Sequence, residues 1–145
     1  MKKVLMILIL GLVFTAAYAE ESYTISGDVK FRENGDIYIC LYTSEEFREY
    51  PKHELSTPPC KFIKMNADLK KKGTVSFKFD NVQKGVYGLF TFQDINENKM
   101  VDLENYCPKE PWGSYKEQDT PGFCPNWSEI NFHLEKDIKG IKIKM

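Results

Sequence analysis

Hydrophobic and polar residues alternate in five segments of the chain, with a period of two residues rather than the helical period of about 3.6. Every second side chain is apolar, and those between are polar or amphipathic, which is typical of strands with one buried and one solvated face. The five segments are residues 23–31, 37–42, 74–80, 130–135 and 141–144. The pattern therefore predicts five half-buried strands.

Two further segments complete the predicted sheets. Residues 86–92 are almost all apolar or aromatic, which indicates a central strand buried on both faces, and residues 60–68 are a weaker strand candidate. Asn34-Gly35 is a tight-turn signal between the first two strands, residues 70–73 predict a polar turn, and residues 45–50 predict a short helical turn. About seven strands in one chain predict an all-β fold, an antiparallel β-sandwich.

The longest interruption of this pattern runs from Asp94 to Glu129. It holds four of the seven prolines of the chain, and because proline cannot donate a backbone hydrogen bond, regular strands are not expected there. A connection of this length in a compact domain is usually functional or held by a covalent link. We therefore expect residues 94–129 to form one long loop with a functional role.

The first nineteen residues predict an export signal. Lys2 and Lys3 precede an apolar run over residues 4–14, and Ala17-Tyr18-Ala19 matches the small residues that a signal peptidase accepts. The run is shorter than the roughly 20 apolar residues that span a bilayer. We expect residues 1–19 to be cleaved and residues 20–145 to form a single periplasmic or secreted domain without a transmembrane segment.

Four cysteines follow the predicted signal, namely Cys40, Cys60, Cys107 and Cys124. An even number in a small exported domain predicts disulfides. Three pairings are possible; we favour Cys107 with Cys124, which closes the irregular loop, and Cys40 with Cys60. A zinc site is the less favoured alternative, because no two cysteines have the C-x₂-C spacing.

Oxygen-bearing residues at alternate positions begin the long loop. Asp94, Asn96, Asn98 and Asp102 occupy positions 1, 3, 5 and 9 of a calcium-binding loop, and Met100 would contribute its backbone carbonyl at position 7. Calcium is a hard cation that prefers oxygen ligands. The sequence therefore predicts calcium as a cofactor at this loop.

Two positions of this loop depart from the calcium-binding pattern. Lys99 stands at position 6, where glycine is usual, and Asn105 stands at position 12 in place of a bidentate glutamate, with Glu104 one residue early. We therefore expect a weak site, with a dissociation constant on the order of 10⁻⁴–10⁻³ M. The alternative is an Asx-rich turn whose side chains only cap their own backbone.

Aromatic side chains are concentrated in the second half of the long loop. Trp112, Tyr115 and Trp127 are candidates for a ligand surface, together with Tyr106 and Phe123. Exposed rings of this kind stack on sugars or anchor a protein partner. The alternative is that they pack over one end of the sandwich as a satellite core.

Charge and missing motifs exclude several classes of function. The formal net charge is −1, which argues against the basic face that a nucleic-acid partner requires. The sequence contains no G-x-S-x-G, no phosphate-binding glycine loop and no H-E-x-x-H. We therefore expect a protein that is not an enzyme.

Several short motifs follow one another along the chain, at residues 41–47, 82–87, 94–98, 100–102 and 110–114. With these motifs in this order, the chain resembles a bacterial family catalogued as domain of unknown function 2141. The resemblance implies an exported single domain with a transthyretin-like or immunoglobulin-like sandwich, and it implies no reaction. The family usually has glycine within the Asx-rich loop, where this chain has Glu97 and Lys99.

These features favour a non-catalytic binding module of the cell envelope whose long loop is the working surface. A glycan or an envelope protein would be its partner. A purely structural or accessory domain is the alternative. A hydrolase with an unrecognised site is a third hypothesis, which would require Glu110 to gather with Asp94 and Asp102 around a deep cleft.

Overall fold

The computed structural model describes residues 21–49, 59–105, 107–116 and 124–145. The predicted signal peptide, Tyr106 and Phe123 lie outside these residues. Most of the described chain is in strands, which confirms the all-β fold class. The longer strands are β1 (Ser22–Lys30), β2 (Asp36–Tyr42), β3 (Cys60–Ile63), β4 (Thr74–Gln83), β5 (Gly85–Asp94), β9 (Asn131–Leu134) and β10 (Ile138–Lys144). The shorter elements are β6 (Leu103–Glu104), β7 (Cys107–Pro108), β8 (Trp112–Ser114), α1 (Ser44–Glu49), α2 (Ala67–Lys72) and α3 (Trp127–Ile130).

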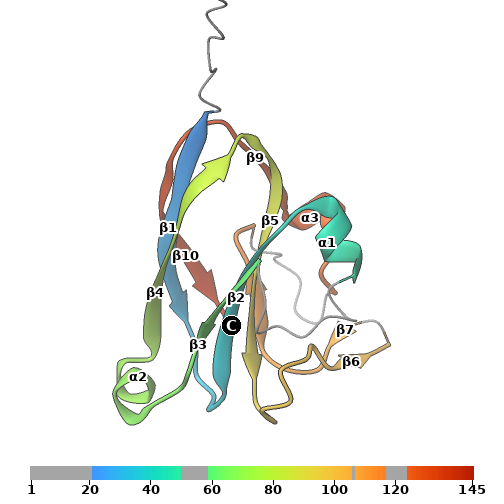
Figure 1. Cartoon of the computed structure of the whole chain (residues 1–145). Helices are drawn as coiled ribbons and strands as arrows, with labels where there is room; N and C mark the ends of the chain where they lie inside the picture. Colours follow the sequence, from blue (N-terminus) through green and yellow to red (C-terminus); the bar gives the residue numbers. More distant parts are fainter. Residues whose placement is uncertain (1–20, 50–58, 106, 117–123) are drawn as a thin grey trace, which may run out of the picture.

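Two sheets face each other and form a sandwich (Figure 1). Sheet A has the strand order β10-β1-β4, and sheet B has the order β3-β2-β5-β8, with β9 pairing the first part of β5. The pairs are antiparallel except for β1 and β10, which run parallel. Sheet A is therefore mixed rather than purely antiparallel. No helix in the described ranges is long and apolar enough to cross a membrane.

The alternating residues of the sequence fill the space between the sheets. In β1, Ile25 and Val29 are fully buried, and in β10 Ile141 and Ile143 face the same core. Burying a side chain of this size stabilises a fold by about 1.5–3 kcal/mol, which makes this core the main support of the sandwich. The other buried members are Phe31, Ile37, Ile39, Leu41, Val75, Phe77, Leu89, Phe132 and Leu134.

Sheet B is buried on its outer face as well. Tyr38 and Cys40 of β2 and Phe90 and Phe92 of β5 point away from sheet A and are almost fully buried. They pack against Phe47 of α1, Val101 of the long loop and Ile130 of α3. The prediction of a central strand buried on both faces, made for residues 86–92, is thus correct from Gly88 onward, whereas Val86 is exposed; most of β2 is buried on both faces too.

The turn at Asn34-Gly35 joins the two sheets and does not form a hairpin, because β1 and β2 belong to different sheets. Gly35 is required there by close packing rather than by a left-handed backbone. A Cβ at this position would lie 2.5 Å from the backbone oxygen of Asp94. The start of the long loop is therefore in direct contact with the first connection of the chain.

The segment after β3 corrects two predictions. The strand expected over residues 60–68 ends at Ile63, and the polar turn expected over residues 70–73 is the end of helix α2. Asn66 caps this helix by accepting a hydrogen bond from the Leu69 amide at 2.9 Å, and Gly73 ends it with a φ of 64°. The helical turn predicted near residues 45–50 is α1.

The expectation of one irregular loop over residues 94–129 is wrong, because this segment contains β6, β7, β8 and α3. Of these, β8 contains no proline and pairs with β5 through Phe90, Thr91 and Phe92. The prolines lie around β8 rather than within it. Strand pairing was therefore compatible with a proline-rich segment.

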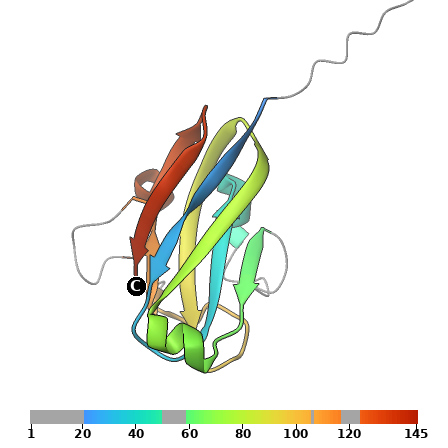
Figure 2. The ribbon, with the colours of Figure 1, turned by 90° about the vertical axis from the view of Figure 1, so that its left-hand side faces the viewer.

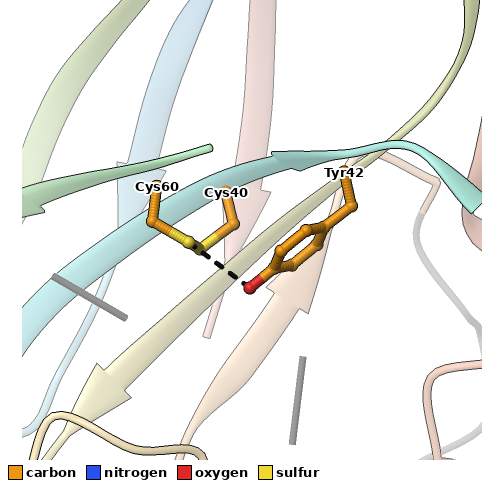
Figure 3. Close-up of a disulfide and its surroundings, with 3 residues drawn as sticks. All are labelled: Cys40, Tyr42 and Cys60. Atoms are coloured by element: carbon orange, nitrogen blue, oxygen red, sulfur yellow. Dashed lines mark hydrogen bonds between the residues drawn. A yellow bond between two sulfur atoms is a disulfide. The ribbon is translucent and has the colours of Figure 1, made fainter. Parts of the chain in front are cut away.

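Two disulfides join the cysteines in the pairing that the sequence favoured. Cys40–Cys60 links the neighbouring strands β2 and β3, with 4.0 Å between the Cα atoms. The Tyr42 hydroxyl donates a hydrogen bond to the Cys60 sulfur at 3.3 Å (Figure 3). Cys107–Cys124 links β7 to the residues that precede α3. The first disulfide thus joins two neighbouring strands of sheet B, and the second fixes the β6–β7 hairpin to the residues before α3.

Gly113 of β8 lies in close contact with β10 of the other sheet. A Cβ on Gly113 would be 2.5 Å from the Lys144 backbone oxygen and 2.7 Å from an Ile143 side-chain carbon. Strands β8 and β10 belong to different sheets and share no backbone pairing. At this edge the two sheets are therefore held together by packing alone. Only glycine allows the two backbones to approach in this way.

We predict that Gly113→Ala lowers the free energy of unfolding by about 2 kcal/mol, because β8 and β10 must move apart. Gly140→Ala is the matched control. Gly140 has a φ of 74° with open space around it, so alanine there costs only the backbone term of about 1 kcal/mol. Urea unfolding measures both variants, and an equal loss in the two would contradict the close contact.

Candidate functional site

The Asx-rich loop begins at the buried end of β5. Asp94 is 0% exposed although it carries a carboxylate. Its Oδ1 accepts a hydrogen bond from the backbone N–H of Asn98 at 3.2 Å, and its Oδ2 accepts one from the backbone N–H of Lys99 at 2.8 Å. A carboxylate has about four acceptor positions, so each oxygen retains capacity for a further partner.

The side chains of Asn96, Asn98 and Asp102 meet on the exposed side of this loop. The Asn96 amide nitrogen donates to Asp102 at 2.5 Å, and that of Asn98 donates to both Asp102 oxygens at 3.0 and 3.1 Å. The side-chain Oδ1 of Asn98 accepts a hydrogen bond from the backbone N–H of Met100 at 2.8 Å. The structure thus brings Asp94, Asn96, Asn98 and Asp102 to one short loop, in the order that the spacing predicted.

The loop adopts a left-handed backbone at residues where the sequence offers no glycine. Glu97 has a φ of 58° and Lys99 a φ of 62°. A left-handed conformation costs a residue with a Cβ roughly 1–2 kcal/mol. The position at which Lys99 replaces the usual glycine therefore takes the conformation that the calcium-loop pattern requires, at an energetic cost.

Glu110 joins this loop from the far side of the β6–β7 hairpin, and it was not among the predicted ligands. Its Oε1 accepts hydrogen bonds from the amides of Ile95 at 2.7 Å and Asn96 at 3.4 Å. Its Oε2 is buried and has no hydrogen-bond partner. Burial raises the pKa of Glu110, and the negative charges of Asp102 and Asp94 raise it further. Three carboxylates therefore share one small region.

Backbone contacts on both sides hold Glu110 in this place. The Lys109 amide donates to the Asp102 backbone oxygen at 2.9 Å, and the Gln93 amide donates to the Pro111 oxygen at 2.9 Å. The spacing rule missed Glu110 because it follows Asp102 by a hairpin rather than by a fixed number of loop residues. The sequence had joined Glu110 to Asp94 and Asp102 only in the hydrolase hypothesis, and the structure does bring these three carboxylates into one region.

The donors of this site suit a hard cation. Asp94, Asp102 and Glu110 supply carboxylates, and Asn96 and Asn98 supply amide oxygens. Binding would require a rearrangement, because the two amides turn their nitrogen atoms toward Asp102. The carboxylates would have to move as well, because the described part of the chain contains no group of three or more His, Cys, Asp or Glu side chains placed to hold a metal ion.

A hollow of about 360 Å³ borders the loop on its other side. Ile95 and Glu97 line it from the loop, and Met65 and Lys70 line it from the α2 segment. None of the three carboxylates, Asp94, Asp102 or Glu110, lines this hollow. This hollow is therefore not the cleft around Asp94, Asp102 and Glu110 that the hydrolase hypothesis requires.

The aromatic residues predicted as a ligand surface are divided between two places. Trp112 stacks on Phe90 with 5.6 Å between ring centroids, and Trp127 packs on Phe47 at the same centroid distance. Both contacts belong to the outer face of sheet B. These tryptophans are half-buried, which matches the satellite-core alternative.

Tyr115 lies apart from the two tryptophans. Its ring meets that of Phe132 edge to face at 5.1 Å, and it packs against the core between the sheets. The structure therefore does not bring Trp112, Tyr115 and Trp127 together in one packed group. Tyr106 and Phe123, the other two aromatics of this prediction, fall outside the described residues.

The fold and site define a class of small β-sandwich domains with an Asx-rich loop at the end of the central strand. Residues 28–142 match the bacterial family described as "Uncharacterized protein conserved in bacteria (DUF2141)", and the chain belongs to this family. The family resemblance seen in the sequence motifs is thereby confirmed. No curated protein and no solved structure matches the chain.

We predict that Glu110→Gln stabilises the metal-free protein at about pH 7. The folded state raises the pKa of Glu110, so it favours the protonated form and disfavours the ionised one. This cost is present above the raised pKa and disappears as the pH falls through it. Glutamine carries no charge, and its amide can donate toward Asp94 and Asp102 where Oε2 has no partner.

Thermal unfolding with a chelator present measures this effect. The melting temperature of Glu110→Gln should exceed that of the wild type at about pH 7, and the difference should vanish near pH 4. Glu97→Gln is the matched control, because Glu97 is an exposed carboxylate of the same loop, and its effect should stay within about 0.5 kcal/mol. A less stable Glu110→Gln protein at pH 7 would contradict the assignment.

Proposed function

We propose that this protein is a non-catalytic binding module of the cell envelope, periplasmic or secreted, whose Asx-rich loop binds calcium with the help of Glu110. Two disulfides support an oxidising compartment, because such bonds rarely persist in the cytosol. A glycan or an envelope protein is the partner class that we propose for the module.

The buried Oε2 of Glu110 is the observation that carries the calcium proposal. A buried carboxylate oxygen without a partner costs free energy, and two further carboxylates next to it increase that cost. A divalent cation between Glu110, Asp94 and Asp102 would remove both costs at once. Glu110 would also supply the acidic ligand that the loop lacks at Asn105.

Calcium would further use groups that the loop already holds close together. Rotation of the Asn96 and Asn98 amides would turn their oxygen atoms toward Asp102, and the Met100 carbonyl would complete the set. Because the amides must rotate and left-handed residues strain the loop, the affinity stays in the weak extracellular range, about 10⁻⁴–10⁻³ M.

We predict that calorimetric titration of the chelator-treated protein detects calcium binding in this range. Bound calcium should also raise the melting temperature, with a gain of about 1.4 kcal/mol at ten times the dissociation constant. Magnesium should bind more weakly, because it demands octahedral geometry and loses water reluctantly. No heat and no melting shift at about 5–10 mM calcium would end the proposal.

Variants separate a calcium site from a nonspecific charge effect. Asp102→Asn and Glu110→Gln should each weaken calcium binding, and Glu97→Gln, which removes the same charge from the same loop, should leave it unchanged. If Glu97→Gln weakens binding as much as Glu110→Gln does, diffuse attraction explains the titration and the site is wrong.

A structural or accessory domain is the second candidate, favoured by the packing of Trp112 on Phe90 and of Trp127 on Phe47. In that case the long connection would only cover the outer face of sheet B. The two candidates differ in one respect, because only a binding module has a saturable partner.

A further inference from the structure

The outer face of sheet A is polar along its whole length, and its positive charge is concentrated at one end. This face looks toward the viewer in Figure 2, where β10, β1 and β4 lie side by side and α2 lies at the lower end. Lysines from β1, β10 and α2 gather there. We call Lys30, Lys72, Lys142 and Lys144 the lysine strip.

Strand register places three of these lysines next to one another. Lys30 of β1 lies directly beside Lys144 of β10, and on its other side it lies beside Thr74 of β4. In the neighbouring outward row, Asp28 lies between Lys142 and Ser76. The residues between these rows, Val29, Ile143 and Val75, face the core, so the lysines point to solvent.

Asp28 is the only side-chain carboxylate in these two rows of the described face, and it is already engaged. It accepts hydrogen bonds from Lys142 and from the Ser76 hydroxyl. The hydrogen bond from Lys142 lowers the pKa of Asp28 most, that from Ser76 comes next, and the charge of Lys72 contributes as well. Lys72 of α2 is therefore close enough to interact electrostatically with Asp28.

Among the described residues, the other three cations of the strip form no ion pair, although the charge of Lys72 is felt at Asp28. These three, Lys30, Lys72 and Lys144, are exposed. Like charges side by side on neighbouring strands destabilise a sheet. The contact between β1 and α2, where the Phe31 amide donates to the Gly73 oxygen at 3.1 Å, keeps the third cation nearby.

We propose that the lysine strip binds an anionic polysaccharide of the cell envelope, one that carries carboxylate, sulfate or phosphate groups. The inference names a ligand class for the proposed binding module and rests on that role, but it uses no part of the calcium site. Charge complementarity identifies the partner as a polyanion, because a flat face with uncompensated cations attracts repeated negative groups.

The composition of the face favours a glycan over a membrane. Hydroxyl groups of Thr24, Ser26, Thr74 and Ser76 stand among the charged residues of β1 and β4, and such groups exchange hydrogen bonds with sugar hydroxyls. The exposed large hydrophobic residues of the described chain are Phe62, Val86 and Ile95, and none of them is on β1, β10 or β4. The face therefore offers no apolar side chain for insertion into a bilayer.

The net charge of −1 does not oppose this assignment, because it is a sum over the whole chain. Carboxylates of the Asx-rich loop and Glu110 contribute negative charge away from the outer face of sheet A. At physiological salt, exposed charges more than about 8 Å apart are largely screened from one another. A polyanion on the lysine strip would therefore respond mainly to the local lysines.

The test uses the protein exported to the periplasm, so that its disulfides form, in chelator-containing buffer at about 0.15 M salt. Heparin octasaccharide is the polyanionic probe, neutral dextran is the uncharged probe, and binding is followed by calorimetry. We expect saturable binding of heparin that weakens as salt rises, and no binding of dextran. Absence of heparin binding would overturn the proposal, and the calcium titration would still stand on its own result.

The double variant Lys30→Gln/Lys144→Gln should bind heparin about tenfold more weakly. Each exposed ion pair with the ligand contributes less than tenfold to affinity, and the variant removes two of them. Its melting temperature should not fall, because the variant removes a like-charge pair. Lys84→Gln/Lys136→Gln is the matched control, since it removes two exposed lysines from the connections before β5 and before β10. Equal weakening in both double variants would overturn the assignment to the strip.

Two further probes separate other macromolecular partners. Vesicles of phosphatidylcholine with phosphatidylglycerol test a membrane, and a short duplex DNA tests a nucleic acid. Weaker binding of both than of heparin supports the glycan. Binding of either one that is tighter than heparin binding and depends on Lys30 and Lys144 would overturn it in favour of that partner.

Discussion

The burial of sheet B on both faces is the constraint on which the rest of this structure depends. One face of β2 and β5 packs on sheet A, and the other presents Tyr38, Phe90 and Phe92 to the outside of the sandwich. Leaving such rings in water would forfeit about 1.5–3 kcal/mol for each. The chain after β5 therefore returns over this face with Val101, Trp112 and α3, and α1, which precedes β5, covers the face as well.

This return path creates the candidate site. To reach the outer face, the chain leaves β5 through the Asx-rich loop, forms the β6–β7 hairpin, and rejoins the sheet as β8. Glu110 lies between the hairpin and β8, and hydrogen bonds at Lys109 and Pro111 fix the backbone around it. A residue eight positions beyond the last loop ligand is thereby carried back to the loop, because the sheet must be covered. The disulfide at Cys107 holds the same hairpin to the residues before α3.

How much the sequence could predict follows from how local each signal is. Alternation along β1, β4 and β10 gave the strands, because one face of sheet A is in water and the pattern records that directly. Helix α2 was not predicted, because its six residues bury no side chain and therefore show no helical hydrophobic pattern. Only the caps at Asn66 and Gly73 could have indicated it. The loop ligands were predictable from spacing within nine residues. Glu110 was not, since only strand pairing brings it to the loop. Composition also could not show that the two tryptophans and Tyr115 pack in different places, because it does not distinguish an exposed ring from one that covers a sheet.

Two places in this domain break the local rules that stabilise a fold, and they do so with opposite charge. At the Asx-rich loop, a buried carboxylate oxygen has no partner and two other carboxylates lie nearby, while Glu97 and Lys99 hold left-handed conformations. At the lower end of sheet A, Lys30 and Lys144 lie side by side, and neither has an ion pair with another described residue. Such departures persist in natural proteins mainly where function requires them. In our proposals, a compact cation that enters a small, partly enclosed set of oxygens relieves the first departure, whereas an extended anion covers the second, which lies on an open face. The two proposed sites thus differ in the ligand they would take, and because they belong to opposite sheets, occupation of one would not block the other.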